Sequence, residues 1–214
     1  MRVTHFGHSC LLVETAAARV LLDPGVFSHG FEELQDLDAV VITHAHPDHV
    51  DVERLESLLE ANDGAQLRAE PATAASLTES GIGARPLHPG EHVELAGVRI
   101  EAAGGRHAVI HADIPRIGNV GVLLSAEGEP TLFHPGDSYE TVPAGVDVLA
   151  VPIAAPWAAL KETVEFVRAA GAATGLVIHE GVLSAPGRAV YGNQVRTLGG
   201  LDLREPQGTT PLEF

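Results

Sequence analysis

Several residue types that mark common protein classes are scarce in this chain. It has one cysteine, Cys10, which excludes an internal disulfide framework. Aromatic residues make up only 4% of the sequence and hydrophobic residues 45%, so we expect a core of Ala, Val, Leu and Ile packed in layers. No apolar run approaches the roughly 18 residues of a membrane-spanning helix, and the opening MRVTHFGHSC does not resemble a secretion signal. We therefore expect a cytoplasmic protein with no membrane partner.

Basic residues are scarce as well. The 13 Lys and Arg residues are outnumbered by 29 Asp and Glu residues, which gives a formal net charge of −16. A field of that sign repels phosphate backbones, so we expect a small-molecule substrate and no nucleic acid partner. The length of 214 residues predicts a single domain spanning residues 1–214. Self-association into a homo-oligomer is compatible with this composition.

In contrast, potential metal ligands are dense within residues 39–51, AVVITHAHPDHVD. Neutral imidazoles and carboxylates suit zinc and similar divalent ions. Alternate residues of an extended segment point the same way, so His44 and His46 can bind one ion together. A turn would direct Asp48 and His49 toward a second ion about 4 Å from the first. The alternative is a surface histidine cluster, which the density of ligands after a buried strand disfavours.

This HxHxDH pattern resembles that of the metallo-β-lactamase superfamily, and further motifs extend the resemblance over most of the chain. They are GHS at residues 7–9, LLDPG at 21–25, GGRH at 104–107, GDS at 136–138 and IH at 178–179. The opening GHS and the order of the later motifs look most like the branch that includes ascorbate-6-phosphate lactonase. The resemblance implies an α/β fold, the four-layer αββα sandwich.

A binuclear metal site follows from the same resemblance. It implies that the first ion is held by His44, His46 and His107, the second by Asp48, His49 and His179, and that Asp137 bridges both. The expected cofactors are two divalent metal ions, preferably zinc, with manganese and iron as alternatives. A hydroxide shared by the ions would attack the substrate, and Asp48 would also carry the proton as the catalytic residue.

Other polar residues have two interpretations each. Asp23 either orients a ligand histidine from behind the metals, as carboxylates in outer shells commonly do, or only forms a turn. His8 either lines the site as an outer-shell residue or caps a turn. His111, His134 and Arg116 are candidate substrate contacts; the alternatives are a surface position for His111, an outer-shell position or the far side of a strand for His134, and a salt bridge from Arg116 to Asp113.

Hydrophobic periodicity and turn residues predict the remaining organisation. Residues 3–6, 10–14 and 19–22 are expected to form a three-stranded meander, followed by a loop over 25–38. Further strands are expected at 98–103, 119–125, 131–133, 146–153 and 175–178, and helices over 52–59, 72–80, around 160–167 and 184–195. A (β/α)₈ barrel is rejected because that fold typically needs about 250 residues and does not open with a meander.

Together these features predict a metal-dependent hydrolase of a small ester, lactone or phosphoester. One alternative is a di-iron redox enzyme, although such relatives usually carry Glu at the position of His46 and a flavin domain. The other is a metal-free binding protein of the same fold, which a complete ligand set disfavours.

Overall fold

The first three strands form the predicted antiparallel meander. In the computed structural model, which describes residues 1–206 and 208–214, they are β1 (Arg2–His5), β2 (Leu11–Glu14) and β3 (Arg19–Leu22). The chain then switches to parallel pairing, which requires a crossover connection. The crossover contains a short 3₁₀ helix, η1 (Phe31–Glu33), within the segment predicted as a loop. The parallel strands are β4 (Ala39–Ile42), β5 (Gln66–Ala69) and β6 (Arg85–Pro86).

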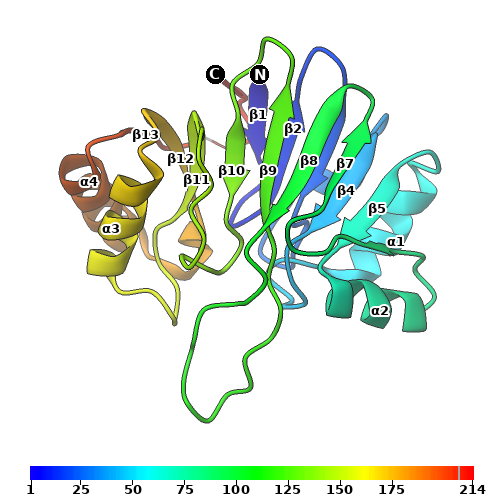
Figure 1. Cartoon of the computed structure of the whole chain (residues 1–214), viewed down its shortest axis with the longest axis horizontal. Helices are drawn as coiled ribbons and strands as arrows, with labels where there is room; N and C mark the ends of the chain where they lie inside the picture. Colours follow the sequence, from blue (N-terminus) through cyan, green and yellow to red (C-terminus); the bar gives the residue numbers. More distant parts are fainter. Residues whose placement is uncertain (207) are drawn as a thin grey trace.

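A second sheet repeats this layout. Its antiparallel half consists of β7 (His92–Leu95), β8 (Val98–Ala103), β9 (Gly121–Ala126) and β10 (Leu132–His134). Its parallel half consists of β11 (Val148–Pro152), β12 (Thr174–Ile178) and β13 (Asp202–Arg204). Within the described residues each sheet has seven strands, and β14 (Leu212–Glu213) completes the first by pairing with β1. The two ends of the chain therefore lie side by side, as Figure 1 shows.

Four α-helices lie within the described residues, and several of their ends carry residues that favour those positions. They are α1 (Val52–Glu60), α2 (Pro71–Glu79), α3 (Leu160–Ala170) and α4 (Ala185–Gly199). The Asp51 side chain accepts a hydrogen bond from the Arg54 amide and so caps the start of α1. Pro71 occupies the first turn of α2, one residue before the predicted start. Gly171 ends α3 in the left-handed conformation that glycine adopts readily.

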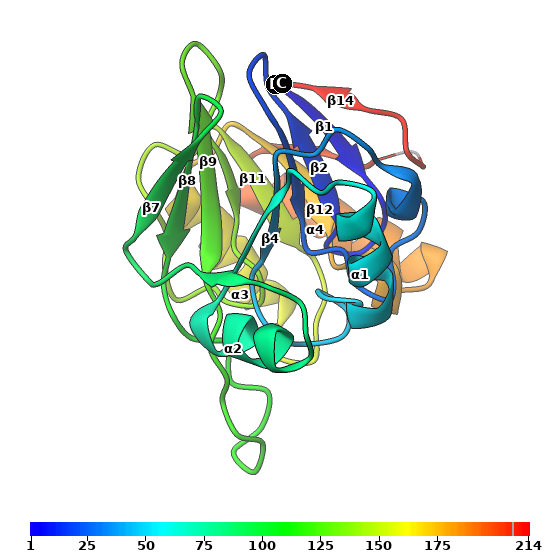
Figure 2. The ribbon, with the colours of Figure 1, turned by 90° about the vertical axis from the view of Figure 1, so that its right-hand side faces the viewer.

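Three apolar layers hold the sheets and helices together. The layer between the two sheets consists of 20 buried residues, all of them Ala, Val, Leu or Ile, which fits the expectation drawn from the low aromatic content. A second layer joins the first sheet to α1 and α2, and a third joins the second sheet to α3 and α4. Figures 1 and 2 show the resulting order of helices, sheet, sheet and helices. The predicted αββα sandwich is confirmed.

The loop between β8 and β9, residues 104–120, extends beyond the lower edge of the sheets in Figure 1. That loop and the loops after β4, β10 and β12 carry the predicted metal ligands. None of the helices in the described ranges is both long enough and apolar enough to cross a bilayer.

Candidate metal centre

The predicted ligands, although far apart in sequence, converge on one site in the structure. Within the described residues they form two groups, in each of which the candidate ligand atoms lie within 4.8 Å of one another. The first group consists of His44, His46, His107 and Asp137. The second consists of His8, Asp48, His49 and His179. We refer to these groups as the first and second clusters.

The first cluster is nearly closed to solvent. His44 and His107 are buried and His46 is half-buried. His44 Nε2 lies 3.2 Å from His46 Nδ1, and His107 Nε2 lies 3.3 Å from Asp137 Oδ2. The spacing of alternate residues after β4 therefore brings two imidazoles to one point, and the loop after β8 supplies the third.

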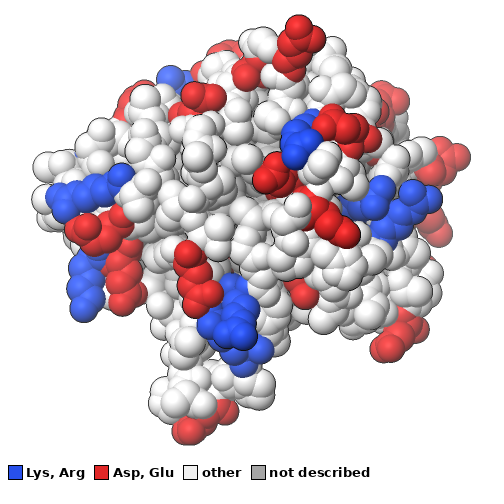
Figure 3. Space-filling view, in the orientation of Figure 1, with Lys and Arg blue, Asp and Glu red and all other residues white. Residues whose placement is uncertain are grey.

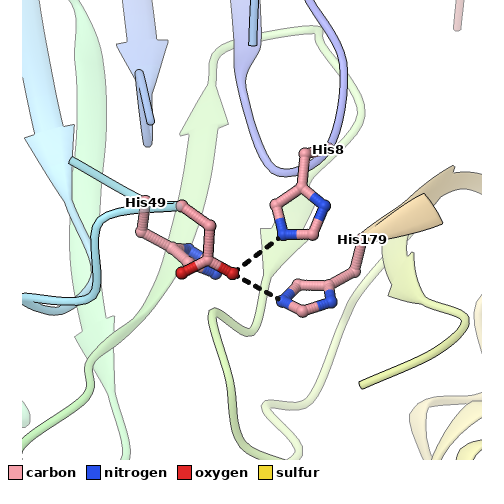
Figure 4. Close-up of side chains that lie close together, drawn as sticks. His8, His49 and His179 are labelled. Atoms are coloured by element: carbon pink, nitrogen blue, oxygen red, sulfur yellow. Dashed lines mark hydrogen bonds and ion pairs between the residues drawn. The ribbon is translucent and has the colours of Figure 1, made fainter. Parts of the chain in front are cut away.

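The second cluster surrounds the carboxylate of Asp48. His8 Nε2 lies 3.0 Å from Asp48 Oδ2, and His179 Nε2 lies 3.7 Å from the same oxygen. Figure 4 shows His8 and His179 directed at this oxygen with His49 beside it. The ring centroids of His8 and His179 are 4.0 Å apart. His8 thus lines the site as a member of the second cluster.

Asp137, a member of the first cluster, also reaches the second. Its Oδ1 atom is 3.0 Å from His49 Nε2 and 3.1 Å from His179 Nε2, while its Oδ2 atom faces His107. One oxygen is therefore directed at each cluster, which is the arrangement that a bridging carboxylate requires.

Hydrogen bonds to the remote ring nitrogens orient three of the histidines. Nδ1 of His107 donates to the Ala108 carbonyl at 2.7 Å, and Nδ1 of His179 donates to the Ala154 carbonyl at 2.7 Å. Nδ1 of His49 lies 2.6 Å from Asp23 Oδ2. A neutral ring that donates through Nδ1 presents the lone pair of Nε2, so all three can bind metal through Nε2, and His49 would release its second proton on binding.

Unsatisfied buried atoms show that the clusters fit metal ions. Nε2 of His107, Nε2 of His179 and Oδ1 of Asp137 are buried and have no hydrogen-bond partner. Such atoms are rare in folded proteins because burial without a partner costs free energy. Each lies 3.0–3.3 Å from another ligand atom of the centre without the geometry of a hydrogen bond, and a divalent ion held by the same residues would satisfy all three.

The charge states of His44 and of the two carboxylates favour cation binding. Burial, together with the neighbouring His49, holds the pKa of His44 well below its usual value, so its imidazole is neutral. Burial raises the pKa of Asp48, but the hydrogen bond from His8 and the charge of His49 outweigh it and lower the pKa to about 2. His49 and His179 likewise overcome the burial of Asp137 and hold its pKa well below the usual range. Both carboxylates are therefore ionised.

Asp23 supports the second cluster through its contact with His49. Its carboxylate is fully buried and accepts hydrogen bonds from the amide and the hydroxyl of Thr43, both at 2.7 Å, as well as from His49. These contacts are those an orienting carboxylate needs, and a turn residue alone would not require them.

A family model described as the beta-lactamase superfamily domain matches residues 2–178, most of the chain. The chain belongs to the metallo-β-lactamase superfamily. Protein Rv0786c of Mycobacterium tuberculosis is 47% identical over 192 residues, covering 89% of each chain. A UPF0173 metal-dependent hydrolase of Xanthobacter autotrophicus is 28% identical over 64% of this chain and 62% of its own length, so the match spans less than two thirds of that relative.

Structural similarity supports the superfamily fold. YhfI from Bacillus subtilis, described as a metallo-beta-lactamase fold protein, matches with a TM-score of 0.76 and 16% sequence identity over 99% of each chain. At that identity the likeness shows the fold alone.

The structure places the three candidate substrate contacts differently: His134 in the interior, His111 on the surface, and Arg116 beside the ligand His107, whose carbonyl accepts a hydrogen bond from its guanidinium group. His134 is completely buried, with Nε2 2.9 Å from the Ser9 carbonyl oxygen, so it supports the site from within and cannot meet a substrate. His111 is exposed on the loop after β8, where it pairs with Asp113. Arg116 pairs with Glu140, and the predicted pairing with Asp113 is wrong.

Other residues at the centre were missed by the sequence analysis. Asn119 accepts a hydrogen bond from the Asp137 amide at 2.9 Å, and the indole of Trp157 donates to Asp137 Oδ2 at 2.7 Å. Neither residue belongs to a ligand motif, so only the fold reveals the contact. Gly25 is required sterically, since a Cβ atom there would lie 2.0 Å from the Asp48 carbonyl oxygen.

Proposed function

We propose that this protein is a metal-dependent hydrolase that uses two divalent ions, preferably zinc. The observation that carries the proposal is the position of Asp137, with one carboxylate oxygen facing each histidine cluster. The relative from Xanthobacter autotrophicus that is named a metal-dependent hydrolase supports it. The proposed ligands are His44, His46 and His107 at the first position, Asp48, His49 and His179 at the second, and Asp137 at both. Bound ions would supply a hydroxide at neutral pH and polarise the substrate's electrophilic atom.

Asp48 is our candidate for the residue that carries the proton. It is half-buried, whereas Asp137 is almost fully buried, so Asp48 is the more accessible of the two carboxylates. Its Oδ2 atom has His8 as a hydrogen-bond partner at 3.0 Å. A carboxylate held in this way keeps one oxygen oriented by the imidazole and can pass a proton between the nucleophile and the leaving group.

Charge supports a small substrate over a nucleic acid. The net charge is −16, and basic side chains on the face shown in Figure 3 lie next to acidic ones. Arg54 pairs with Glu32, Arg99 with Glu94, and Arg116 with Glu140. Such pairing leaves little unbalanced positive charge to bind a polyanion. Within small substrates we favour a lactone, another ester or a phosphoester, because the GHS motif resembles the lactonase branch.

The proposal is tested by metal loading followed by turnover. Protein reconstituted with Zn²⁺, Mn²⁺ or Fe²⁺ is assayed on a panel of lactones, esters and phosphodiesters, and on DNA and RNA. We expect metal-dependent hydrolysis of a small substrate that His107→Ala abolishes and His111→Ala, an exposed histidine on the same loop, preserves. Oxygen consumption without hydrolysis by the iron form would instead support the redox alternative. A folded protein that retains no metal would support a binding role.

A further inference from the structure

The chain has a single tryptophan, Trp157, and it is buried against the proposed metal centre. It lies in the segment between β11 and α3. Its Nε1 atom donates a hydrogen bond of 2.7 Å to Asp137 Oδ2. The indole nitrogen is only a donor, and a buried donor needs an acceptor, so this bond determines how the ring and the carboxylate lie relative to each other.

The indole hydrogen bond leaves lone pairs on both carboxylate oxygens of Asp137 available for metal ions. A carboxylate oxygen has two lone pairs, and Oδ2 can use one for the indole and the other toward His107 and the first cluster. Oδ1 lies 3.0 Å from Nε2 of His49 and 3.1 Å from Nε2 of His179, without the geometry of a hydrogen bond to either ring, and so faces the second cluster. The Asp137 amide is separately held by Asn119. Asn119 thus restrains the main chain of Asp137, and Trp157 restrains its carboxylate.

Trp157 is itself held by the aromatic residues beside α3. Its ring makes an edge-to-face contact with Tyr139, with centroids 4.8 Å apart, and Tyr139 stacks on Phe166 at 4.5 Å. The Tyr139 hydroxyl donates to the Pro152 carbonyl at 2.5 Å, which ties it to the end of β11. The indole is therefore supported by a helix and a strand of the second sheet.

We propose that Trp157 is a positioning residue that orients the Asp137 carboxylate to bridge two metal ions. The inference rests on the proposed function, because it requires a binuclear centre. The indole hydrogen bond limits rotation of the carboxylate, so each oxygen stays directed at its own cluster. Its ring centroid lies 6.2 Å from that of His107 and 6.4 Å from that of His179, which places it beside a ligand of each cluster.

Trp157→Phe tests the inference, because phenylalanine keeps an aromatic ring in the stack and removes the donor. We expect the affinity for Zn²⁺ to fall roughly 10 to 100-fold, the usual effect of losing an outer-shell hydrogen bond to a ligand. The visible spectrum of the Co²⁺ form should change as well. The matched control is Tyr139→Phe, which removes the hydroxyl bond to Pro152 but leaves the indole donor, and we expect its Zn²⁺ affinity and Co²⁺ spectrum to match those of the wild type.

Fluorescence provides a second readout in the unaltered protein. With one tryptophan in the chain, all tryptophan emission comes from a side chain bonded to a proposed ligand. Addition of Zn²⁺ to metal-free protein should shift or quench that emission in proportion to occupancy, and Co²⁺ should quench it more strongly. This measurement tests whether ion binding is felt at the bond between Trp157 and Asp137, even if Trp157→Phe does not fold.

The outcomes separate the two proposals. Wild-type protein that folds and binds no metal would overturn the binuclear function. Wild-type protein that binds two ions without any change in Trp157 emission, or a folded Trp157→Phe variant with wild-type affinity and spectrum, would overturn only the role of Trp157.

Discussion

Nδ1 of His49 lies 2.6 Å from Oδ2 of Asp23, and both side chains are fully buried. Burial lowers the pKa of His49, but the carboxylates of Asp137 and Asp23 together outweigh it and raise that pKa well above its usual value. The imidazole is thus held between the carboxylates of Asp23 and Asp137. Its ring orientation is set before any ion binds.

Asp23→Ala should therefore weaken metal binding by roughly 10 to 100-fold, as measured by competition with a chelating dye. The change also removes the acceptor for the Thr43 amide and hydroxyl, so we expect a loss of about 1–3 kcal/mol in the free energy of unfolding. Asp23→Asn keeps one oxygen for Thr43 and serves as the control, with a smaller loss of stability. Unchanged affinity in Asp23→Ala would show that Asp23 is only a turn residue.

His46→Ala should empty the first metal position and leave the second occupied. His46 is half-buried, so truncation disturbs the fold little, yet it removes one of three imidazoles from the first cluster. Affinity at that position should fall by more than the roughly 100-fold upper range of outer-shell changes. Elemental analysis should then give close to one ion per chain, whereas His111→Ala should match the wild type. Equal occupancy in His46→Ala and the wild type would contradict this assignment.

His8→Phe should weaken the second position. Phenylalanine fills the buried space of the imidazole but cannot bond to Asp48, which lies 3.0 Å from His8 Nε2. A fall in affinity of roughly 10 to 100-fold would indicate that His8 acts through Asp48, and a larger fall would indicate direct ligation. Isothermal titration with Zn²⁺ separates the two positions. Wild-type affinity at both would remove His8 from the centre.

Cys10 should be unreactive in the native protein. Its thiol is completely buried in the layer against α1 and α2, and burial raises the pKa of the thiol well above its usual value. Because the thiolate is the reactive form and unfolding costs at least about 5 kcal/mol in a typical domain, labelling by Ellman's reagent should be roughly a thousandfold slower than in guanidinium chloride. Rapid labelling without denaturant would show that this layer opens readily.

Local sequence patterns predicted much of the fold, and the limits of that prediction have physical causes. The apolar run of β4 and the leucine spacing of α1 are strong local signals, and both elements lie close to where they were expected. Strands β6 and β14 have two residues each and no recognisable alternation. β14 pairs with β1 from the opposite end of the chain, a contact that no local pattern encodes.

The candidate site likewise has one part that local sequence patterns predict and another that only the fold reveals. Ligands grouped in motifs could be predicted because metal chemistry restricts both residue type and spacing. Contacts between residues that only the folded chain brings together could not be predicted, and the bond from Trp157 to Asp137 is one of them. The wrong partner for Arg116 has this origin too. Asp113 is near in sequence, but the fold brings Glu140 to the guanidinium group.

The most direct measurement is the number and location of metal ions in the reconstituted protein. Elemental analysis combined with anomalous diffraction at the zinc edge should show two ions per chain, one in each cluster, with Asp137 contacting both. Asp137→Ala should lower the occupancy of both positions together, since each cluster loses the oxygen directed at it. A folded protein with no ion under any loading condition, or with a single ion bound away from Asp137, would contradict the binuclear centre.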